Sequence, residues 1–529
     1  MEKFNNLREI IENSAKKYPN NIAFKVKKKD ENKNVSYDEI NYVRLKNEIE
    51  YLGRYLLNNN LGEKRIAVIG KNSYEWMLVY LSVVCTGGVI VPLDRGLMEF
   101  EINEQLSRSG AEAIFYADAF KEVMSGKENI FKICMDDEEF NELLKLGAQY
   151  DNKKEYDEIK IDNEKMSALL FTSGTTSQSK AVMLSQKNIA VNVSSLIEWE
   201  KFYETDVNMA FLPLHHTFGI TSVLIFLSVG MCNVFCEGLR IQKCLNEYGV
   251  TVFVGVPRIL EEIYLTIQRK LASQKKTGKV KFALALSNFM RKLGIDISRK
   301  LFKQIIDALG GKLRFIIVGA APASPEVLKW FNEIGILSVQ GYGLTETAPV
   351  LSAETDVYMR DGSVGKSVPG VEIKVVDTDE NAVGEIIARG ENVMLGYFGD
   401  EESTAEVIKD GWFYTGDMGR VDDDGYIYIS GRKKNVIVLS NGKNVFPEEI
   451  ESLVSECKAI KECIVYAQDD EILLKAVRDT NFEGDCDSAI EEHIKAVNEK
   501  LIYYKRISSY IVTDEEMEKT TTGKIKRYK

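Results

Sequence analysis

This chain of 529 residues contains little histidine and no closely spaced pair of cysteines of the CxxC type. Only three histidines are present, His215, His216 and His493, so few side chains can act as a general base near neutral pH. The eight cysteines lie far apart without any CxxC pair, which argues against a zinc or dithiol redox site. Free thiols in a reducing compartment are favoured, and we therefore predict a cytoplasmic location.

Positive charge is not in excess. The chain has 68 lysines and arginines against 80 acidic residues, a net charge of −12. Proteins that bind phosphate backbones usually carry clustered basic residues, so we expect no nucleic-acid partner.

Long apolar runs are also lacking. The amino terminus has no uninterrupted apolar core of the signal-peptide type. Residues 207–236 contain no side chain charged at neutral pH, but Pro213, Gly219 and Gly230 divide them. This pattern predicts a strand, a buried helix and a strand, so we expect no transmembrane segment.

What the chain does contain is an alternation of strand-like and helix-like segments. Strands are predicted at 65–70, 89–93 and 113–117, with helices at 74–85 and 100–109. The pattern returns as a strand at 314–318, a helix at 325–334 and a strand at 337–339. Such alternation indicates parallel strands covered by helices, an α/β body of doubly wound sheets.

Two segments differ from this pattern. Residues 261–312 are rich in lysine and have helical spacing, which predicts a helical excursion on the surface. The composition also changes near 431–434, and the order that follows predicts a small α+β domain of about a hundred residues. Its predicted elements are a strand at 435–439, a helix at 447–456, strands at 462–467 and 472–477, a helix at 488–501 and a strand at 509–513.

A hydroxyl-rich loop follows the apolar run 166–171. Residues 172–180 read TSGTTSQSK, where small residues, hydroxyls and a terminal lysine could surround a phosphate. A Ser/Thr-rich linker explains the loop equally well when it is taken alone. The candidate ligand-binding residues are Thr172, Ser173, Gly174, Thr175, Thr176 and Lys180.

Three further motifs carry chemistry. In 340–347 the glycines Gly341 and Gly343 flank Tyr342, and Glu346 offers a carboxylate suited to magnesium. Asp417 could accept hydrogen bonds from ribose hydroxyls, although a turn acid is an equal alternative. A lysine, Lys524, lies in the terminal motif TTTGKI.

The loop at 172–180, the segment 340–347, Tyr414 to Asp417 with Gly431-Arg432, and Gly523-Lys524 occur in an order that resembles the adenylate-forming superfamily. The resemblance covers essentially the full length. It implies a large domain at 1–433 and a small mobile lid at 434–529, with a hinge at Lys434. One orientation of the lid would bring Lys524 to the active site for adenylation, and the other would bring the Gly442 loop there for thioester formation.

The resemblance also implies the reaction and its participants. ATP and Mg²⁺ would activate a carboxylic acid as acyl-AMP, and coenzyme A would then accept the acyl group. Catalytic roles fall on Lys524, Glu346, Thr172 and His216, with Glu346 as the metal ligand. The implied cofactor-binding set is Thr172, Ser173, Gly174, Thr175, Thr176, Lys180, Ala321, Gly341, Tyr342, Gly343, Thr345, Asp417, Arg432 and Lys524.

The substrate class follows from a narrower resemblance. The helical excursion and the segments 215–219 and 91–94 are similar to the long-chain fatty acyl-CoA synthetase branch, which implies a medium- or long-chain acid. The implied acyl pocket consists of His216, Phe218, Gly219, Gly319 and Ala320. Chain length does not follow from these residues.

Two alternatives remain open. The acceptor could be an acyl carrier protein, because its phosphopantetheine arm ends in the same thiol as coenzyme A. Alternatively, the chain could bind acyl groups or nucleotides with impaired catalysis, because Ser177, Ser179 and Ala181 stand where relatives usually have Gly, Pro and Gly. A positive φ at 177 or 181 would cost on the order of 1 kcal/mol. A Walker NTPase is excluded, since Ser179 precedes the lysine and Ala181 follows it.

Overall fold

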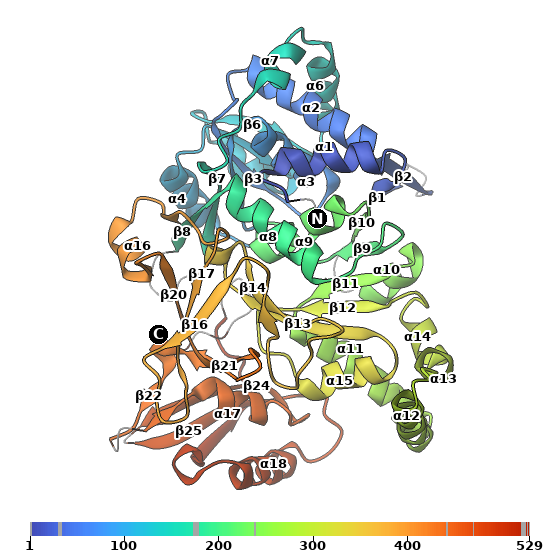
Figure 1. Cartoon of the computed structure of the whole chain (residues 1–529), viewed down its shortest axis with the longest axis vertical. Helices are drawn as coiled ribbons and strands as arrows, with labels where there is room; N and C mark the ends of the chain where they lie inside the picture. Colours follow the sequence, from blue (N-terminus) through green and yellow to red (C-terminus); the bar gives the residue numbers. More distant parts are fainter. Residues whose placement is uncertain are drawn as a thin grey trace.

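The computed structural model describes residues 3–29, 34–172, 179–236, 240–440, 443–468 and 470–519, together with residues 525 and 527. The described residues form two large mixed sheets, one five-stranded antiparallel sheet, a two-stranded sheet and a small three-stranded sheet (Figure 1). The α/β class predicted from the alternating pattern is confirmed.

The first sheet carries the hydroxyl-rich loop. Its parallel part consists of five strands between residues 65 and 172, and two short antiparallel strands, at 180–185 and 396–397, close one edge. In spatial order the strands are β18 (Gly396–Tyr397), β8 (Lys180–Ser185), β7 (Met166–Thr172), β4 (Val89–Leu93), β3 (Arg65–Ile69), β5 (Ala113–Tyr116) and β6 (Phe131–Cys134).

The second sheet is parallel at its centre and antiparallel at both edges. In spatial order it contains β15 (Lys366–Ser367), β14 (Val350–Ala353), β13 (Leu337–Gly343), β12 (Phe315–Val318), β11 (Val252–Gly255), β9 (Val207–Ala210), β10 (Cys232–Phe235), β1 (Ile22–Lys29) and β2 (Val35–Asn41). Strand β13 runs four residues beyond the predicted end at 339, because it continues into antiparallel pairing with β14.

Several helices of the amino-terminal half, among them α1 (Leu7–Lys17), α3 (Tyr74–Cys85), α8 (Gln186–Trp199) and α9 (Thr217–Ser228), contribute to the core that the two sheets share, whereas α4 (Glu99–Ser109) and α5 (Lys121–Ser125) pack on the other face of the first sheet (Figure 1). One buried core, which includes Val68 and Leu170 of the first sheet and Val252 and Val339 of the second, joins them. Helix α3 is buried on nearly every side, and Ser73 caps it by accepting a hydrogen bond from the Trp76 amide. The helices of this half are α1 (Leu7–Lys17), α2 (Tyr42–Asn58), α3 (Tyr74–Cys85), α4 (Glu99–Ser109), α5 (Lys121–Ser125), α6 (Glu138–Gln149), α7 (Lys153–Glu158), α8 (Gln186–Trp199) and α9 (Thr217–Ser228).

The lysine-rich segment is helical, as predicted, and flanks the second sheet (Figure 1). The helices around it are α10 (Ile241–Tyr248), α11 (Pro257–Ser273), α12 (Thr277–Lys292), α13 (Ser298–Leu301), α14 (Lys303–Ala308) and α15 (Pro325–Glu333). Among the described residues, no helix is both long and apolar enough to cross a membrane.

An antiparallel sheet leads to the small carboxyl-terminal part. It consists of β16 (Glu372–Val376), β17 (Gly384–Arg389), β19 (Ile408–Lys409), β20 (Trp412–Val421) and β21 (Ile427–Arg432), with α16 (Glu401–Val407) at its edge. The strand expected at 435–439 is largely absent. A 3₁₀ turn, η3 (Lys433–Asn435), occupies its start, where Asn435 donates to Glu448.

The small part has a hydrophobic core of its own, drawn from residues between 439 and 507. It lies below the body in Figure 1, and its helix α17 packs against β21. Its elements are β22 (Ile437–Val438), β23 (Asn444–Val445), α17 (Pro447–Val454), β24 (Ile460–Gln468), β25 (Glu471–Arg478), α18 (Cys486–Lys500) and β26 (Ile507–Thr513).

Candidate active site

The hydroxyl-rich loop connects the two strands of an antiparallel hairpin. Thr172 at the end of β7 pairs with Lys180 at the start of β8, and the Thr172 hydroxyl donates to the Lys180 carbonyl over 3.3 Å. Both ends of the loop are therefore fixed side by side. The predicted residues between them, Ser173, Gly174, Thr175 and Thr176, lie outside the described residues.

Ala181 carries no left-handed strain. It lies in the extended strand β8, is 4% exposed and pairs with Phe171. Its φ is not positive, so the cost expected there is wrong. Strand pairing requires extended backbone at this position, which any residue can adopt. Ser177, the other position concerned, lies outside the described residues.

Arg108 is a second cation at the loop, and sequence reasoning missed it. From the last turn of α4, its guanidinium donates to the Ser179 carbonyl over 2.7 Å and to the Ser179 hydroxyl over 3.3 Å. The same group lies 5.3 Å from the centre of the Phe171 ring. Arg108 thus holds the carboxyl end of the loop and adds positive charge next to Lys180. A single arginine on an amphipathic helix gives no pattern that marks it.

Lys180 and Glu346 meet through a tyrosine that the motifs do not include. The Lys180 ammonium lies 4.5 Å from the centre of the Tyr397 ring, and the Tyr397 hydroxyl donates to the Glu346 carboxylate over 3.0 Å. Strand β18 places Tyr397 there by pairing with β8. Burial, followed by the charge of Glu346, raises the pKa of Tyr397, so the phenol stays a hydrogen-bond donor.

Glu346 lies in a 3₁₀ turn, η2 (Thr345–Thr347), directly after β13. Its carbonyl accepts a hydrogen bond from the Met394 amide over 2.8 Å, which fixes the turn to the segment that leads into β18. A carboxylate has about four acceptor positions, and Tyr397 uses one of them. Oxygen ligands of this kind fit magnesium, so the side chain is suited to hold a metal ion beside the loop.

Tyr342, Asp417 and Arg432 form a second cluster from three strands. The Tyr342 hydroxyl donates to one Asp417 oxygen over 2.7 Å, and the Arg432 Nε lies 2.9 Å from the other. Asp417 and Arg432 face each other across β20 and β21. Burial raises the pKa of Tyr342, so it donates to a charged carboxylate. A carboxylate can accept several hydrogen bonds, so Asp417 is also of a type that can bind ribose hydroxyls.

Close backbone packing explains why glycine is present on both sides of Tyr342. Gly343 is required by close backbone packing, because a Cβ there would lie 1.9 Å from the Pro349 carbonyl oxygen. A Cβ on Gly341 would lie 3.2 Å from the Ser352 carbonyl oxygen, a tight contact. Both residues are part of β13, and the approach of β14 accounts for them rather than the approach of a ligand.

The residues expected around the acyl group come together from α9 and the turn after β12. A Cβ on Gly319 would lie 3.1 Å from the Phe218 ring, so the two segments are in direct contact. Gly219 is equally constrained, since its Cβ would lie 2.2 Å from the Pro213 carbonyl oxygen. His216 precedes the first turn of α9.

The neighbouring histidine, His215, faces the carboxyl end of β4. Its Nε2 lies 3.6 Å from an Asp94 carboxylate oxygen, and its ring centre lies 4.3 Å from that of His216. His215 therefore has an acidic neighbour, Asp94, while His216 is the N-cap residue of α9. The third histidine, His493, is remote and contacts the Leu453 carbonyl of α17.

Ala320 adopts a left-handed backbone with φ of +69° beside Ala321, whose φ is not positive. The conformation costs alanine about 1 kcal/mol relative to glycine. We expect Ala320→Gly to raise the apparent melting temperature, whereas Ala321→Gly, the matched control, lowers it. Thermal unfolding of both variants checks this. Equal shifts of the same sign would contradict strain at position 320.

The buried carboxyl group of Glu354 makes the stability of the protein depend on pH. It follows β14, is 5% exposed, and accepts hydrogen bonds from the amides of Gln340 and Arg360. Burial raises its pKa from 4.5 to about 7, with a smaller contribution from Asp361. The folded protein therefore holds an extra proton between these values, and its stabilising effect is complete below pH 4.5 and lost as pH rises through 7.

We expect this carboxyl to remove about 1–3 kcal/mol of unfolding free energy between pH 5 and 8. Glu354→Gln should flatten that slope, whatever the constant effect of the substitution at low pH. Denaturant unfolding at a series of pH values measures both slopes. A variant whose slope equals that of the parent protein would show that Glu354 titrates normally.

Several predicted residues cannot be placed in the site. Lys524 and Gly442 lie outside the described residues. Lys434 is the middle residue of η3, between β21 and the small part. Next to it, Lys433 forms an ion pair of 2.6 Å with Glu385 of β17. The hinge at Lys434, the 433/434 boundary and the two lid orientations stay predictions.

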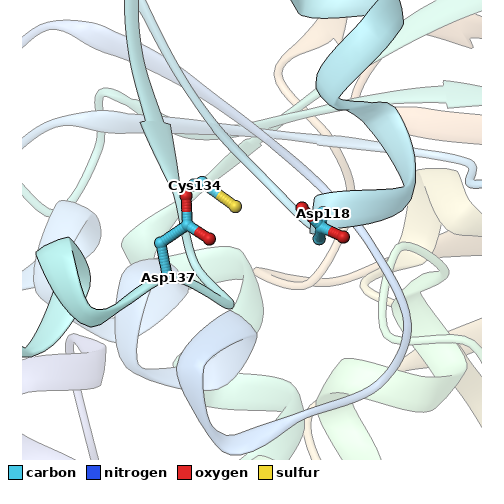
Figure 2. A group of neighbouring side chains, drawn as sticks. All are labelled: Asp118, Cys134 and Asp137. Atoms are coloured by element: carbon cyan, nitrogen blue, oxygen red, sulfur yellow. The ribbon is translucent and has the colours of Figure 1, made fainter.

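A separate group of acids lies at the far edge of the first sheet. Asp118, Cys134 and Asp137 come close together at the carboxyl ends of β5 and β6 (Figure 2). The Lys121 ammonium lies 3.8 Å from Asp118 and 3.4 Å from Asp137, so a side chain already supplies positive charge to both. Burial raises the pKa of Cys134, which disfavours a thiolate ligand. The group is not part of the active site.

The family model for AMP-binding enzymes matches residues 11–398, and the model for the AMP-binding enzyme C-terminal domain matches residues 449–524. Fatty acyl-CoA synthetase B of Dictyostelium discoideum is 28% identical over 87% of this chain and 74% of its own length. Long-chain-fatty-acid–CoA ligase 5 of Rattus norvegicus is 30% identical over 82% of this chain and 70% of its own.

Solved structures share the fold. An O-succinylbenzoate coenzyme A synthetase from Bacillus subtilis, in complex with ATP and magnesium, has a TM-score of 0.75, 22% identity, and coverage of 98% of this chain and 97% of its own. An anthranilate CoA ligase with anthranoyl-AMP has a TM-score of 0.78, 20% identity, and coverage of 99% and 96%. A Mycobacterium tuberculosis fatty acyl CoA synthetase has a TM-score of 0.67, 21% identity, and coverage of 98% and 96%. With a family model that spans most of its length, this chain belongs to the AMP-binding enzyme family, in its branch of adenylate-forming acid–CoA ligases.

Proposed function

We propose that this ligase activates a medium- or long-chain fatty acid. The acid's carboxylate attacks the α-phosphorus of ATP, the bond to pyrophosphate breaks, and acyl-AMP forms. The thiol of coenzyme A then attacks the acyl carbonyl, loses its proton, and releases AMP. Both half-reactions are balanced without any further reactant.

The main support for the proposal is that the segment from β13 to η2 has one cluster of site residues at each end. Tyr342, at one end, joins Asp417 and Arg432, while Glu346, at the other, reaches Tyr397 and Lys180. A nucleotide along this segment would place its ribose at the first cluster and its phosphates at the second. Only three residues separate Tyr342 from Glu346, so the geometry suits one bound nucleotide.

Each described residue has a proposed task. Asp417 and Arg432 hold the ribose, and Tyr342 offers its ring to the adenine. Lys180 and Arg108 supply positive charge to the phosphates from the carboxyl end of the loop, and preorganised charges of this kind stabilise developing anions. Glu346 would hold Mg²⁺, which supplies Lewis-acid stabilisation of phosphate charge.

The acyl end of the site is proposed to lie between α9 and the turn at 319–321. Gly319 lies against Phe218, and the small side chains of Ala320 and Ala321 are exposed there. Apolar residues of this kind can pack against methylene groups. The relatives named as long-chain or fatty acyl-CoA enzymes support an aliphatic acid, at identities of 28–30%.

Chain-length dependence tests the proposal. We expect kcat/KM for acyl-CoA formation to rise about fourfold for each added methylene until the pocket is full, since burial of a CH₂ contributes about 0.8 kcal/mol. The assay uses saturating ATP, Mg²⁺ and coenzyme A with straight-chain acids, and includes o-succinylbenzoate, anthranilate and malonate. A higher kcat/KM for an aromatic or dicarboxylic acid than for every fatty acid would refute the substrate class.

The acceptor is proposed to be coenzyme A, with an acyl carrier protein as the second candidate. When the enzyme is supplied with an excess of coenzyme A or of acyl carrier protein in separate assays, acyl transfer to coenzyme A should be the faster reaction. Faster transfer to the carrier protein would reverse the assignment. A protein with impaired catalysis is disfavoured, because Ala181 adopts an unstrained strand conformation.

A cytoplasmic location is also proposed. The eight cysteines are free thiols, which suits a reducing compartment. Two relatives from Arabidopsis thaliana are named as peroxisomal, and a peroxisomal location is therefore the alternative.

A further inference from the structure

Helix α12 (Thr277–Lys292) exposes an apolar stripe. Phe282, Leu286, Phe289 and Leu293 are 73%, 38%, 59% and 60% exposed. They are separated by four, three and four positions, so they lie on one side of the helix and the turn that follows it. Ile295, two residues further on, is 49% exposed. Large side chains in such continuous exposure mark an interaction surface rather than scattered surface residues.

The opposite side of α12 packs against the body of the protein. Val280, Ala283 and Leu284 pack on the core of the second sheet. Asn288 donates to Glu333 of α15 over 2.8 Å, and Arg291 donates to the carbonyls of Asn332 and Glu333. The helix is therefore anchored with its apolar stripe outward, and Figure 1 shows it at the outer edge of the molecule.

The charge around the stripe is strongly positive in an acidic protein. Residues 269–303 contain eleven lysines and arginines and a single acid, Asp296, whereas the whole chain has a net charge of −12. Lys279, Lys281 and Lys292 flank the stripe, are exposed, and have no acidic partner among the described residues. The basic residues are thus concentrated at the exposed apolar side chains.

We propose that α12 is a lipid-docking surface that binds an anionic bilayer, with the stripe inserted between headgroups and the flanking lysines against lipid phosphates. A helix with an apolar side, a basic rim and no capacity to span is suited to lie in the plane of a membrane interface. Lysines near such a surface are attracted by its negative potential and can extend their ammonium groups to the phosphates.

Other occupants fit less well. A second copy of the chain would bring two basic rims together, which costs electrostatic energy. An acidic carrier protein would complement the charge of the basic rim. However, the exposed side chains of Phe282, Leu286 and Phe289 provide more apolar surface than an interaction driven by charge requires. A bilayer satisfies both features at once.

The surface is connected to the proposed acyl pocket. Helix α12 packs on α15, and α15 begins four residues after Ala321. The docking role does not depend on which acid is activated, so its failure leaves the proposed function intact.

Vesicle sedimentation with the full chain tests the surface. We expect binding to phosphatidylcholine vesicles that contain phosphatidylglycerol, and at least about tenfold weaker binding to phosphatidylcholine alone. Phe282→Ser combined with Phe289→Ser should reduce binding by at least about tenfold, because the apolar anchor is lost. Phe100→Ser, at a site in α4 that is 69% exposed, is the matched control and should bind like the parent protein.

Charge reversal is the second arm. Lys279→Glu combined with Lys292→Glu should reduce binding, whereas Lys165→Glu, at an 81% exposed site elsewhere, should not. Unchanged melting temperatures show that the variants are folded. Vesicle binding that the stripe variants leave intact would overturn the proposal. The proposal would also be overturned if the parent protein bound no vesicles but bound an acidic carrier protein saturably, or formed a dimer in sedimentation velocity, and the stripe variants abolished that interaction.

Discussion

Replacing Glu346 with glutamine is expected to lower kcat/KM for acid-dependent adenylation by about 10²–10³, or about 3–4 kcal/mol of transition-state stabilisation. The substitution keeps the size of the side chain and an oxygen for the Tyr397 hydroxyl, 3.0 Å away, but removes the negative charge proposed to hold Mg²⁺. The concentration of Mg²⁺ needed for half-maximal rate should rise with the loss of rate. Steady-state kinetics over a magnesium series measures both effects.

Two variants separate this role from a structural one. Glu401→Gln, on exposed α16, is the matched control and should leave the rate within about twofold of the parent. Tyr397→Phe keeps the ring beside Lys180 and removes the hydrogen bond to Glu346, so a smaller loss of about tenfold is expected. If Glu346→Gln retains the parental rate and magnesium dependence, the carboxylate does not hold the metal.

Replacing Lys524 with alanine is expected to divide the reaction into its two halves. Adenylation should fall by about 10²–10³, because the lysine is proposed to neutralise charge between the carboxylate and the α-phosphate. Thioester formation from supplied acyl-AMP should stay within about threefold of the parent, since the second half-reaction is proposed to use another lid orientation. Single-turnover measurements with ATP or with acyl-AMP follow each half separately.

The matched control is Lys526→Ala, which removes a lysine two positions away and should leave both halves active. A bulky residue at position 442 gives the reciprocal test. Gly442→Leu is expected to slow thioester formation and spare adenylation. Equal loss of both half-reactions in Lys524→Ala would refute the proposed rotation of the small domain about Lys434.

Local pattern was enough to predict much of the body. The helix 74–85 and the strand 89–93 coincide with α3 and β4, because an apolar run between a serine cap and a glycine pair leaves little choice. The split of 207–236 into β9, α9 and β10 is likewise confirmed. In each case the same short segment contains both the apolar signal and the residues that end the element.

Long-range pairing could not be read in this way. Nothing local indicates that β13 continues through Gly343 into a ladder with β14, or that β20 and β21 place Asp417 opposite Arg432. Motif order nevertheless identified Tyr342 and Asp417, which lie 75 residues apart and share a hydrogen bond. The resemblance, rather than any periodicity, provided that connection.

Arg108 and Tyr397 illustrate what the motifs omit. Each reaches the candidate site through tertiary contacts, Arg108 from the end of α4 and Tyr397 from the two-residue strand β18. An arginine in a last helical turn and a tyrosine after a glycine are common in any sequence. The pairing of β18 with β8 places Tyr397, and the packing of α4 beside β8 places Arg108; a single sequence reveals neither contact.

The two clusters are proposed to bind one nucleotide, which the enzyme uses to activate a fatty acid. Exchange of labelled pyrophosphate into ATP by the full chain, with Mg²⁺ and a series of straight-chain acids but no thiol, tests this most directly. Reversible acyl-AMP formation predicts exchange that requires the acid and is fastest with medium or long chains. Absence of acid-dependent exchange at every chain length would show that this chain does not form an acyl-AMP from a fatty acid.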